Sequence, residues 1–282
     1  MGVSRREFGL QGQRTYQRVC HWGCQRVVNI GAVALAFALA GCQTVPSTDL
    51  SSAAPTYASS DDAAAAIYAP GTQALFPGWE QRRLPAKIWA PFTPVEVDGQ
   101  PGLQVKATSS LSLLRTQLPS PQAEPMEVSF SWWVENLVEG ADLSDSDASD
   151  APVQLLVAFD GDRSRLSARN AMMSELLLLV TGEEMPYASL IYVWANEHPP
   201  GTVIRDPRSD RIRYLVLEQG TQNLRQWVHH RRDIHADYRH VFGEAPGTVA
   251  GLAIMTDTDN TRTQARGVFG PVTLNALESN KP

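Results

Sequence analysis

The cysteines of this chain all lie near its N-terminus, and this position limits how the rest of the chain can be stabilised. Cys20, Cys24 and Cys42 are the three cysteines among 282 residues, so residues 43–282 contain none. A domain built from those residues has no disulfide bonds to restrain it and must be held by a buried core. The composition permits such a core, since 43% of the residues are hydrophobic. We therefore expect a globular fold stabilised by its core alone.

The N-terminal segment has the pattern of an export signal. Residues 1–26 carry five arginines and one acidic residue, and the apolar run Val27–Ala40 follows them. This run is too short to span a bilayer core of about 30 Å, but it is typical of a secretory signal peptide. The sequence Leu39-Ala40-Gly41-Cys42 resembles the end of a bacterial lipoprotein signal, which implies cleavage before Cys42 and attachment of lipid to its thiol. A buried core helix that ends at a chance cysteine is the alternative.

The residues after Cys42 predict location and organisation. Gln43, rather than Asp, follows Cys42. By resemblance to sorted lipoproteins, this favours a cell-envelope location, anchored by lipid in the outer membrane and facing the periplasm. The next stretch is rich in Ser, Ala, Thr, Pro and Asp without an apolar period, so it is predicted to be a flexible tether. We thus expect a signal peptide over residues 1–41, a lipidated cysteine and tether over 42–74, and one domain over 75–282.

That domain has mainly the pattern of β-strands. Short runs with alternating or β-branched and aromatic residues predict strands at Leu103–Thr108, Leu111–Leu118, Met126–Val134, Val153–Phe159, Ala188–Trp194, Ile212–Gln219, Val249–Thr256 and Val268–Leu274. Helical spacing of apolar residues predicts two helices, over 163–181 and 224–242, each followed by a glycine. The expected fold is a β-sandwich decorated by two helices.

Composition and motifs exclude several classes of function. The formal net charge is −6, and the predicted domain has no Lys/Arg run of the kind that binds nucleic acid. The sequence contains no G-x-S-x-G elbow, no H-E-x-x-H motif, no phosphate-binding loop and no G-x-G-x-x-G. We predict neither a nucleic-acid partner nor an organic cofactor, and whether the protein is an enzyme stays open.

Acidic residues that follow strands are candidate ligands. Asp160 and Asp162 follow one strand, and Asp257, Asp259 and Asn260 follow another. Loop carboxylates are what calcium needs, and Asp257, Asp259 and Asp160 are the candidate metal ligands, although no cluster fits the EF-hand spacing. The alternative is that these residues cap helices and close turns, and Asp162 is well placed to cap a helix that begins near Arg163.

Three aromatic residues are candidate ligand-binding positions. Strand alternation places Trp133 on the polar side of Met126–Val134, where an exposed indole could stack on a sugar ring. Burial beneath a decorating helix is the alternative for Trp133. Tyr187 and Trp194 lie in Pro186–Trp194, where Tyr192 and Trp194 point to the same side, and core packing is the favoured alternative there.

Three motifs together resemble a family of bacterial exported proteins. They are Phe159-Asp160-Gly161-Asp162, the stretch Pro186–Trp194 and Met255–Thr261, followed by the end strand Phe-Gly-Pro-Val-Thr-Leu. In this order they are similar to the domain of unknown function numbered 3047, over about residues 76–274. The resemblance implies a jelly-roll-like sandwich of the galactose-binding and carbohydrate-binding type. It implies no catalytic residue, and Trp133 departs from the basic residue that the family tends to have at this position.

Three functions are consistent with these patterns. The first is a lipid-anchored, non-catalytic module that binds a glycan through loops or one sheet face. The second is a glycan hydrolase or lyase, in which the Asp160/Asp162 and Asp257/Asp259 loops would supply a carboxyl pair about 5 to 9.5 Å apart. The third is an envelope scaffold that binds another protein, which a large exposed apolar patch would favour. A binding module is our preferred hypothesis, and the fold does not decide among the three.

Overall fold

The computed structural model describes residues 71–277. The described residues all belong to the compact unit of residues 58–282. The predicted signal peptide, Cys42 and almost all of the predicted tether lie outside the described residues. Within 71–277, no helix has both the length and the apolar character needed to cross a membrane.

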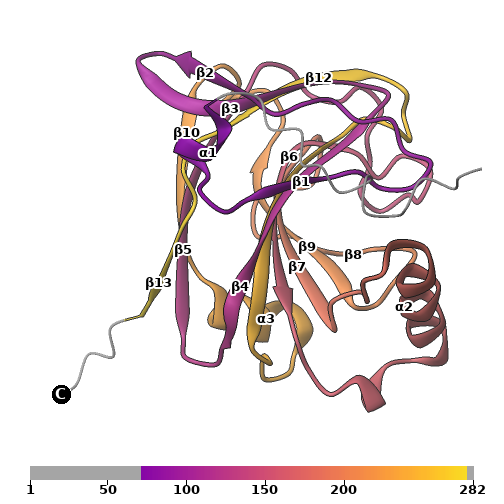
Figure 1. Cartoon of the computed structure of the whole chain (residues 1–282). Coiled ribbons are helices and arrows are strands. Elements are labelled where there is room, and N and C mark those ends of the chain that lie inside the picture. The colour runs from indigo at the N-terminus through magenta and orange to yellow at the C-terminus, as the bar shows by residue number, and fades with distance from the viewer. Residues whose placement is uncertain (1–70, 278–282) are drawn as a thin grey trace, which may run out of the picture. The chain divides into compact units, whose positions relative to one another are not determined.

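The described residues fold into a jelly-roll-like β-sandwich of two sheets (Figure 1). The first sheet has the order β1 (Glu80–Arg82), β4 (Leu111–Gln122), β11 (Val249–Asp257), β6 (Ala151–Phe159), β7 (Ala188–Ala195), β9 (Ile212–Gln219) and β8 (Val203–Arg205). The second has the order β10 (Trp227–Asp233), β5 (Met126–Val134), β12 (Gln264–Phe269), β3 (Gln100–Thr108) and β2 (Thr93–Val97), with β13 (Thr273–Ala276) also paired to β5. Neighbouring strands are antiparallel, apart from the parallel pair β7 and β9.

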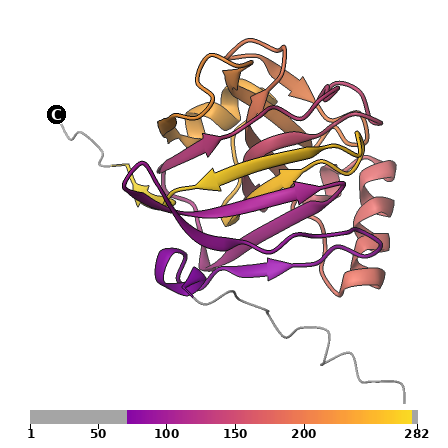
Figure 2. The same cartoon turned by 90° about the horizontal axis from the view of Figure 1, so that it is seen from above.

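The main core lies between the two sheets, and strand alternation explains its composition. On β5 the side chains of Val128, Phe130, Trp132 and Val134 are all buried in this core, as the alternation predicts. Tyr192 and Trp194 of β7 enter the same core from the first sheet. The view from above shows the two layers stacked over one another (Figure 2). Together these apolar side chains provide the burial that a fold without disulfides requires.

A second, smaller core covers the outside of the first sheet. Ile191 and Val193 of β7 point away from the main core and pack with Leu143 of the loop before β6 and with Tyr214 of β9. All eight residues of β7 are therefore buried. A strand covered on both faces has a continuous apolar sequence rather than an alternating one.

The helices differ from prediction in their extent. A 3₁₀ turn (Arg163–Arg165) precedes α2 (Ala168–Thr181), so the first predicted helix is interrupted near its start. A short helix, α1 (Thr72–Leu75), begins before residue 75, and its Thr72 is 1% exposed. Residues 72–74, which the sequence analysis assigned to the tether, thus belong to a helix.

The second predicted helix was wrong over its first half. Residues 227–233 form strand β10, and α3 (Ile234–Phe242) starts only after it. Each residue of β10 pairs with one of β5, from Trp227 opposite Trp133 to Asp233 opposite Glu127. The free edge of β5 therefore overrides the local helical spacing. The last predicted strand is also divided, since β12 ends at Phe269 and β13 begins at Thr273.

The change from β10 to α3 depends on one side chain, and this gives a first prediction. The Asp233 carboxylate accepts hydrogen bonds from the backbone N–H groups of His235 (3.0 Å) and Ala236 (2.9 Å). We expect Asp233→Ala to lower the free energy of unfolding by about 1 kcal/mol, because two amide groups lose their acceptor. Chemical denaturation measures this loss. Asp233→Ser keeps a capping oxygen and should retain most of the stability, and equal losses in the two variants would contradict a capping role.

Candidate functional site

One end of the first sheet gathers three carboxylates. Asp150 immediately precedes β6, Asp257 ends β11 and Asp259 lies in the loop after it. Each contributes an oxygen atom, and these oxygen atoms lie within 4.8 Å of one another. Because β6 and β11 are antiparallel neighbours, the start of one strand meets the end of the other. The structure thus brings Asp257 and Asp259 together with Asp150, a residue that the sequence did not predict as their partner.

Donors from the protein already occupy much of this cluster. The two Asp150 oxygens accept four hydrogen bonds, from the backbone N–H and side chain of Asn260 (3.3 and 2.9 Å) and from those of Thr261 (2.8 and 2.7 Å). The Lys87 ammonium lies 2.6 Å from an Asp259 oxygen. Asn260, a predicted ligand-binding residue, therefore binds the Asp150 carboxylate.

Asp257 is a buried member of the cluster, and its surroundings disfavour ionisation. It is 6% exposed. Burial, followed by the negative charges of Asp150 and Asp259, raises the pKa of Asp257 to about 8. The side chain therefore carries a proton at neutral pH. The set of carboxylates matches calcium in the type of donor, and calcium at this cluster stays a prediction.

The loop after β6 lies at the other end of the first sheet. Phe159 pairs with Val249 at the start of β11, whereas Asp257 pairs with Ala151. Asp160 therefore does not join Asp257 and Asp259, and the shared site predicted from these two loops is wrong. Asp162 accepts hydrogen bonds from the backbone N–H (3.0 Å) and hydroxyl (2.6 Å) of Ser164, which makes it the cap of the 3₁₀ turn.

The predicted aromatic residues have packing roles. Trp133 is 7% exposed and lies beneath the Arg266 guanidinium, 5.1 Å from its ring centre. Trp194 is fully buried, and its indole N–H donates to the Gly220 carbonyl oxygen (2.9 Å). Both tryptophans are therefore packed within the protein, which is the alternative that the sequence analysis gave to sugar binding. An arginine, rather than a helix, covers Trp133.

Tyr187 brings two of the sequence motifs of this chain into contact. Its ring is 3% exposed and packs so closely on Gly161 that a side-chain carbon there would lie 2.3 Å from the ring. The Tyr187 hydroxyl accepts a hydrogen bond from Arg211 (2.5 Å), which also lies over the ring. The Asp160-Gly161 and Pro186-Tyr187 motifs therefore form one packing contact.

An aromatic residue that the sequence analysis placed on a helix lies on the outer face of the second sheet. Trp227 of β10 is half-buried, and its indole N–H donates to the Val97 carbonyl oxygen (2.9 Å). Its six-membered ring lies against Gly102 and Gly270, where an added side-chain carbon would be 3.1 and 3.4 Å from the ring. Glycine within a sheet often marks such a close approach, and these two residues were the available sequence signal.

Polar side chains share this face with Trp227. The Gln100 amide donates to the Ser131 hydroxyl (3.1 Å), and both lie beside Gly270. Gln104 lies further along the same face and accepts a hydrogen bond from Arg266 (3.0 Å). We call Trp227, Gln100, Ser131, Gln104 and Arg266 the Trp227 face. It combines an aromatic ring with amide, hydroxyl and guanidinium groups.

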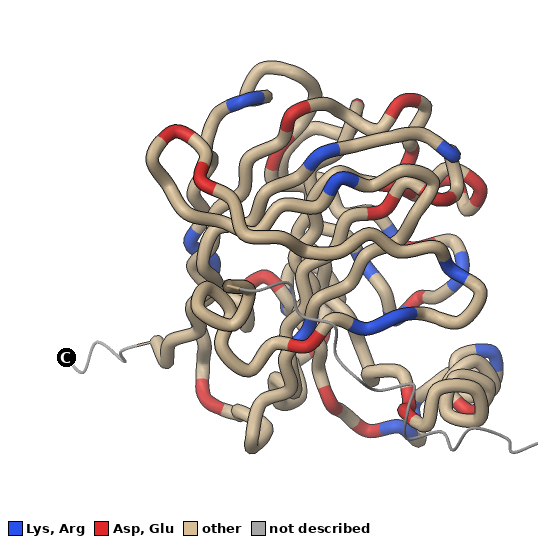
Figure 3. Tube along the Cα trace, turned by 45° about the horizontal axis from the view of Figure 1, so that its top comes forward, with Lys and Arg blue, Asp and Glu red and all other residues tan. Residues whose placement is uncertain are grey.

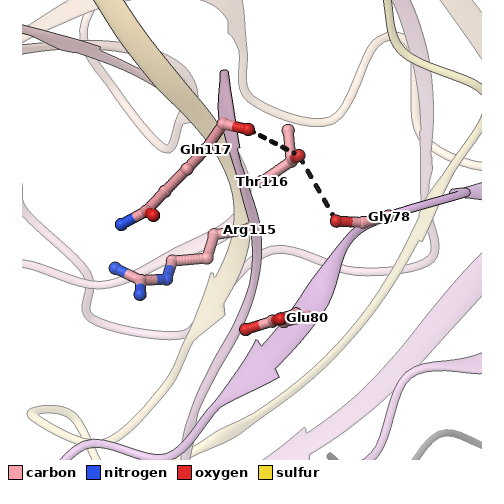
Figure 4. A pocket seen from close by; sticks show the side chains of 5 residues that line it. All are labelled: Gly78, Glu80, Arg115, Thr116 and Gln117. Carbon is pink, nitrogen blue, oxygen red and sulfur yellow. Dashed lines mark hydrogen bonds between the residues drawn. The ribbon is translucent and has the colours of Figure 1, made fainter. Parts of the chain in front are cut away.

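A small hollow lies elsewhere, on the first sheet. Its volume is about 150 Å³, and Figure 4 shows its lining residues Gly78, Glu80, Arg115, Thr116 and Gln117 around β1 and β4. Ligand pockets usually measure roughly 300 to 1,000 Å³. In addition, Arg115 is engaged by Glu183 at 2.6 Å. We assign no ligand to this hollow.

Charged residues are mixed over the described surface. Figure 3 shows Lys and Arg interspersed with Asp and Glu along the trace rather than gathered in one basic stripe. Several of them form ion pairs across elements, such as Arg211 with Glu244 (2.6 Å) and Arg266 with Glu135 (3.2 Å).

Comparison with known proteins gives one family and distant structural similarities. The model of a family described as a protein of unknown function (DUF3047) matches residues 77–273. No curated protein matches the chain.

The similar solved structures include enzymes and binding modules. One is the xyloglucanase domain of NopAA, a type three effector from Sinorhizobium fredii, in complex with cellobiose (10% identity, 71% of this chain and 93% of that chain, TM-score 0.38). Another is the family 11 carbohydrate-binding module of the cellulosomal cellulase Lic26A-Cel5E of Clostridium thermocellum (9% identity, 72% of this chain and 91% of that chain, TM-score 0.35). A third is TmCBM61 in complex with β-1,4-galactotriose (9% identity, 73% of this chain and 94% of that chain, TM-score 0.31). Similarities at this level assign no ligand or activity to this chain.

The raised pKa of Asp257 predicts how stability depends on pH. The native state holds a proton up to about pH 8, whereas the unfolded chain releases it near pH 4, so stability should fall as the pH rises through this interval. The contribution is at most about 6 kcal/mol. Asp257→Asn should remove it, so the variant should gain stability relative to the wild type as the pH rises. Denaturant unfolding at pH 5, 7 and 9 measures the difference, and parallel pH profiles would contradict the prediction.

The same two proteins test for calcium. A cation bound to the ionised cluster would raise the melting temperature of the wild type at pH 9, and Asp257→Asn should lack most of this rise. Melting temperatures that are unchanged by calcium in the wild type would contradict a calcium site.

Proposed function

This chain belongs to the DUF3047 family of proteins of unknown function, and we propose that it is a lipid-anchored envelope protein that binds a glycan on its Trp227 face. The observation that carries the proposal is the half-buried Trp227 ring, which lies against Gly102 and Gly270 on a surface of polar side chains. Binding there needs no catalytic group.

The chemistry of this face suits a sugar. One side of a sugar ring presents C–H groups, which pack well on the electron-rich face of an indole. The hydroxyl groups at the edge of a sugar need hydrogen-bond partners, and the amides of Gln100 and Gln104 and the guanidinium of Arg266 lie on the same face. The Trp227 N–H is already bonded to Val97, which fixes the ring in place before a ligand arrives. A ring that is already ordered loses less entropy on binding.

The proposed anchor rests on the sequence. The Leu-Ala-Gly-Cys end of the N-terminal apolar run supports lipid attachment at Cys42, and Gln43 supports sorting to the outer membrane. Several acyl chains on one residue would give stable attachment, whereas a single chain would not. The predicted tether then lets the sandwich reach glycans in the periplasm.

Glycan binding is tested by replacing the ring. The unit of residues 58–282 should bind at least one purified envelope or plant glycan in an array, and Trp227→Ala should weaken this binding at least tenfold because the stacking surface is lost. Isothermal titration with the selected glycan measures the affinity.

Trp89 provides a matched control for this variant. It is also half-buried, but it lies outside the Trp227 face with Arg83 over its ring (4.0 Å). Trp89→Ala should retain binding. Gln100→Ala tests the polar part of the face without removing the ring. Equal losses in the Trp89 and Trp227 variants, or an array without any bound glycan, would contradict the proposal.

Anchoring is tested separately in cells. Cys42→Ser should abolish incorporation of labelled palmitate and move the protein from the outer-membrane fraction to the soluble periplasmic fraction, because the acylated thiol is lost. Fractionation of cells that express either form measures this. A wild-type protein that incorporates no palmitate would contradict the anchor and leave the glycan test unaffected.

A further inference from the structure

Most of the large hydrophobic side chains that are exposed among residues 71–277 lie on helix α2. Met172, Leu176, Leu178, Leu179 and Val180 have exposed fractions between 39% and 83%, and Ile88 is the one other large hydrophobic side chain within residues 71–277 that is exposed to this degree. Single exposed apolar residues are ordinary, but a contiguous patch usually marks an interaction surface.

The exposed residues form one stripe. Met172, Leu176, Leu179 and Val180 follow one another at steps of four, three and one, which places them on the same side of the helix. We call these four residues the α2 stripe. An ordinary surface helix turns such a stripe toward the core of its own domain. In α2 the buried positions are instead polar, namely Asn170 (6% exposed) and Ser174 (3%).

Hydrogen bonds hold α2 in this orientation. Asn170 accepts from the Ser209 hydroxyl (3.0 Å) and donates to Asp210. Ser174 accepts from Arg163 (2.5 Å) and from the backbone N–H of Met185 (3.2 Å). Turning the stripe inward would break these bonds and bury unpaired polar groups, which is costly. These hydrogen bonds therefore keep the α2 stripe facing outward from the described residues.

The composition of the stripe favours a lipid surface over a protein. Energetically important residues of protein interfaces are enriched in Trp, Tyr and Arg, whereas Leu and Val are under-represented. The stripe has no aromatic residue and consists of three aliphatic side chains and a methionine. Arg169, three residues before Met172, lies on the same side of the helix, and it is exposed. A basic residue at the end of an apolar stripe suits the phosphate groups above the acyl chains.

The predicted anchor would keep this stripe close to a bilayer. The described structure begins at Gly71, and the tether predicted between Cys42 and that residue would have an end-to-end distance of roughly 30 Å. Such tethering corresponds to an effective concentration on the order of millimolar, so a modest affinity suffices. This step rests on the proposed lipid anchor, whereas the orientation of the stripe does not.

We infer that the α2 stripe docks on the phospholipid surface of the membrane that carries the anchor. The four apolar side chains enter the interface between headgroups and acyl chains, with the helix lying along the surface. Docking converts a tethered domain into one with a defined face toward the membrane.

Flotation with phospholipid vesicles tests this inference. The unit of residues 58–282 lacks Cys42, and its core lies within the unit, so the result does not depend on lipidation. With vesicles of phosphatidylethanolamine and phosphatidylglycerol, a measurable fraction of the wild type should float. The double variant Leu176→Ser/Leu179→Ser should lower the partition coefficient at least tenfold, while Ile88→Ser, a change at an equally exposed apolar residue outside α2, should leave it unchanged.

Several results would overturn the inference. They are a wild type that does not float, a double variant that floats as well as the wild type, and an equal loss in Ile88→Ser. Analytical sedimentation without vesicles tests whether the stripe binds a second copy of the chain instead. A wild-type dimer that the double variant abolishes would identify that copy, rather than lipid, as the partner of the stripe. If the double variant binds glycan as the wild type does, the variant is folded. The same result shows that the loss of flotation is independent of the proposed glycan binding.

Discussion

The aromatic contact between the two sheets is the interaction on which the rest of the structure depends. Phe130 of the second sheet stacks on Tyr192 of the first, with ring centres 5.9 Å apart, and Trp132 packs on the edge of Phe130 at 5.0 Å. The Tyr192 hydroxyl donates to Asp237 of α3 (2.8 Å), which Arg232 of β10 also binds. Residues 43–282 contain no cysteine, so such contacts, rather than disulfide bonds, stabilise the fold. The outer face of the second sheet and α2 take no part in these contacts.

The sequence predicted those features of the fold that local pattern determines. The alternation along Met126–Val134 places Phe130 and Trp132 in the core. The predicted helix over 224–242 was wrong over its first half because pairing with the edge of β5 is a long-range contact that overrides local spacing. The partner of Asp257 could not be predicted for a related reason, since Asp150 meets it only through the antiparallel pairing of β6 with β11. Trp227 was missed as a surface residue because it was assigned to that helix.

The acidic cluster shows how a set of carboxylates can be satisfied by the protein itself. Lys87 neutralises Asp259, the Asn260 and Thr261 donors surround Asp150, and Asp257 keeps its proton because burial raises its pKa. A cation at this point would have to replace a proton and compete with an ammonium group. Calcium binding there would therefore depend strongly on pH.

The two proposed binding surfaces lie on different parts of the sandwich, and this matters if the proposed anchor holds the protein at a membrane. α2 packs beside the first sheet, where Glu183, just after the helix, bridges Arg82 of β1 and Arg115 of β4. Trp227 lies on the second sheet, and Figure 1 shows β5 and β13 of that sheet on the opposite side of the described unit from α2. A domain that rests on the membrane through α2 would therefore keep its Trp227 face directed away from the lipid. Glycans of the periplasm would then reach this face without displacing the docked helix.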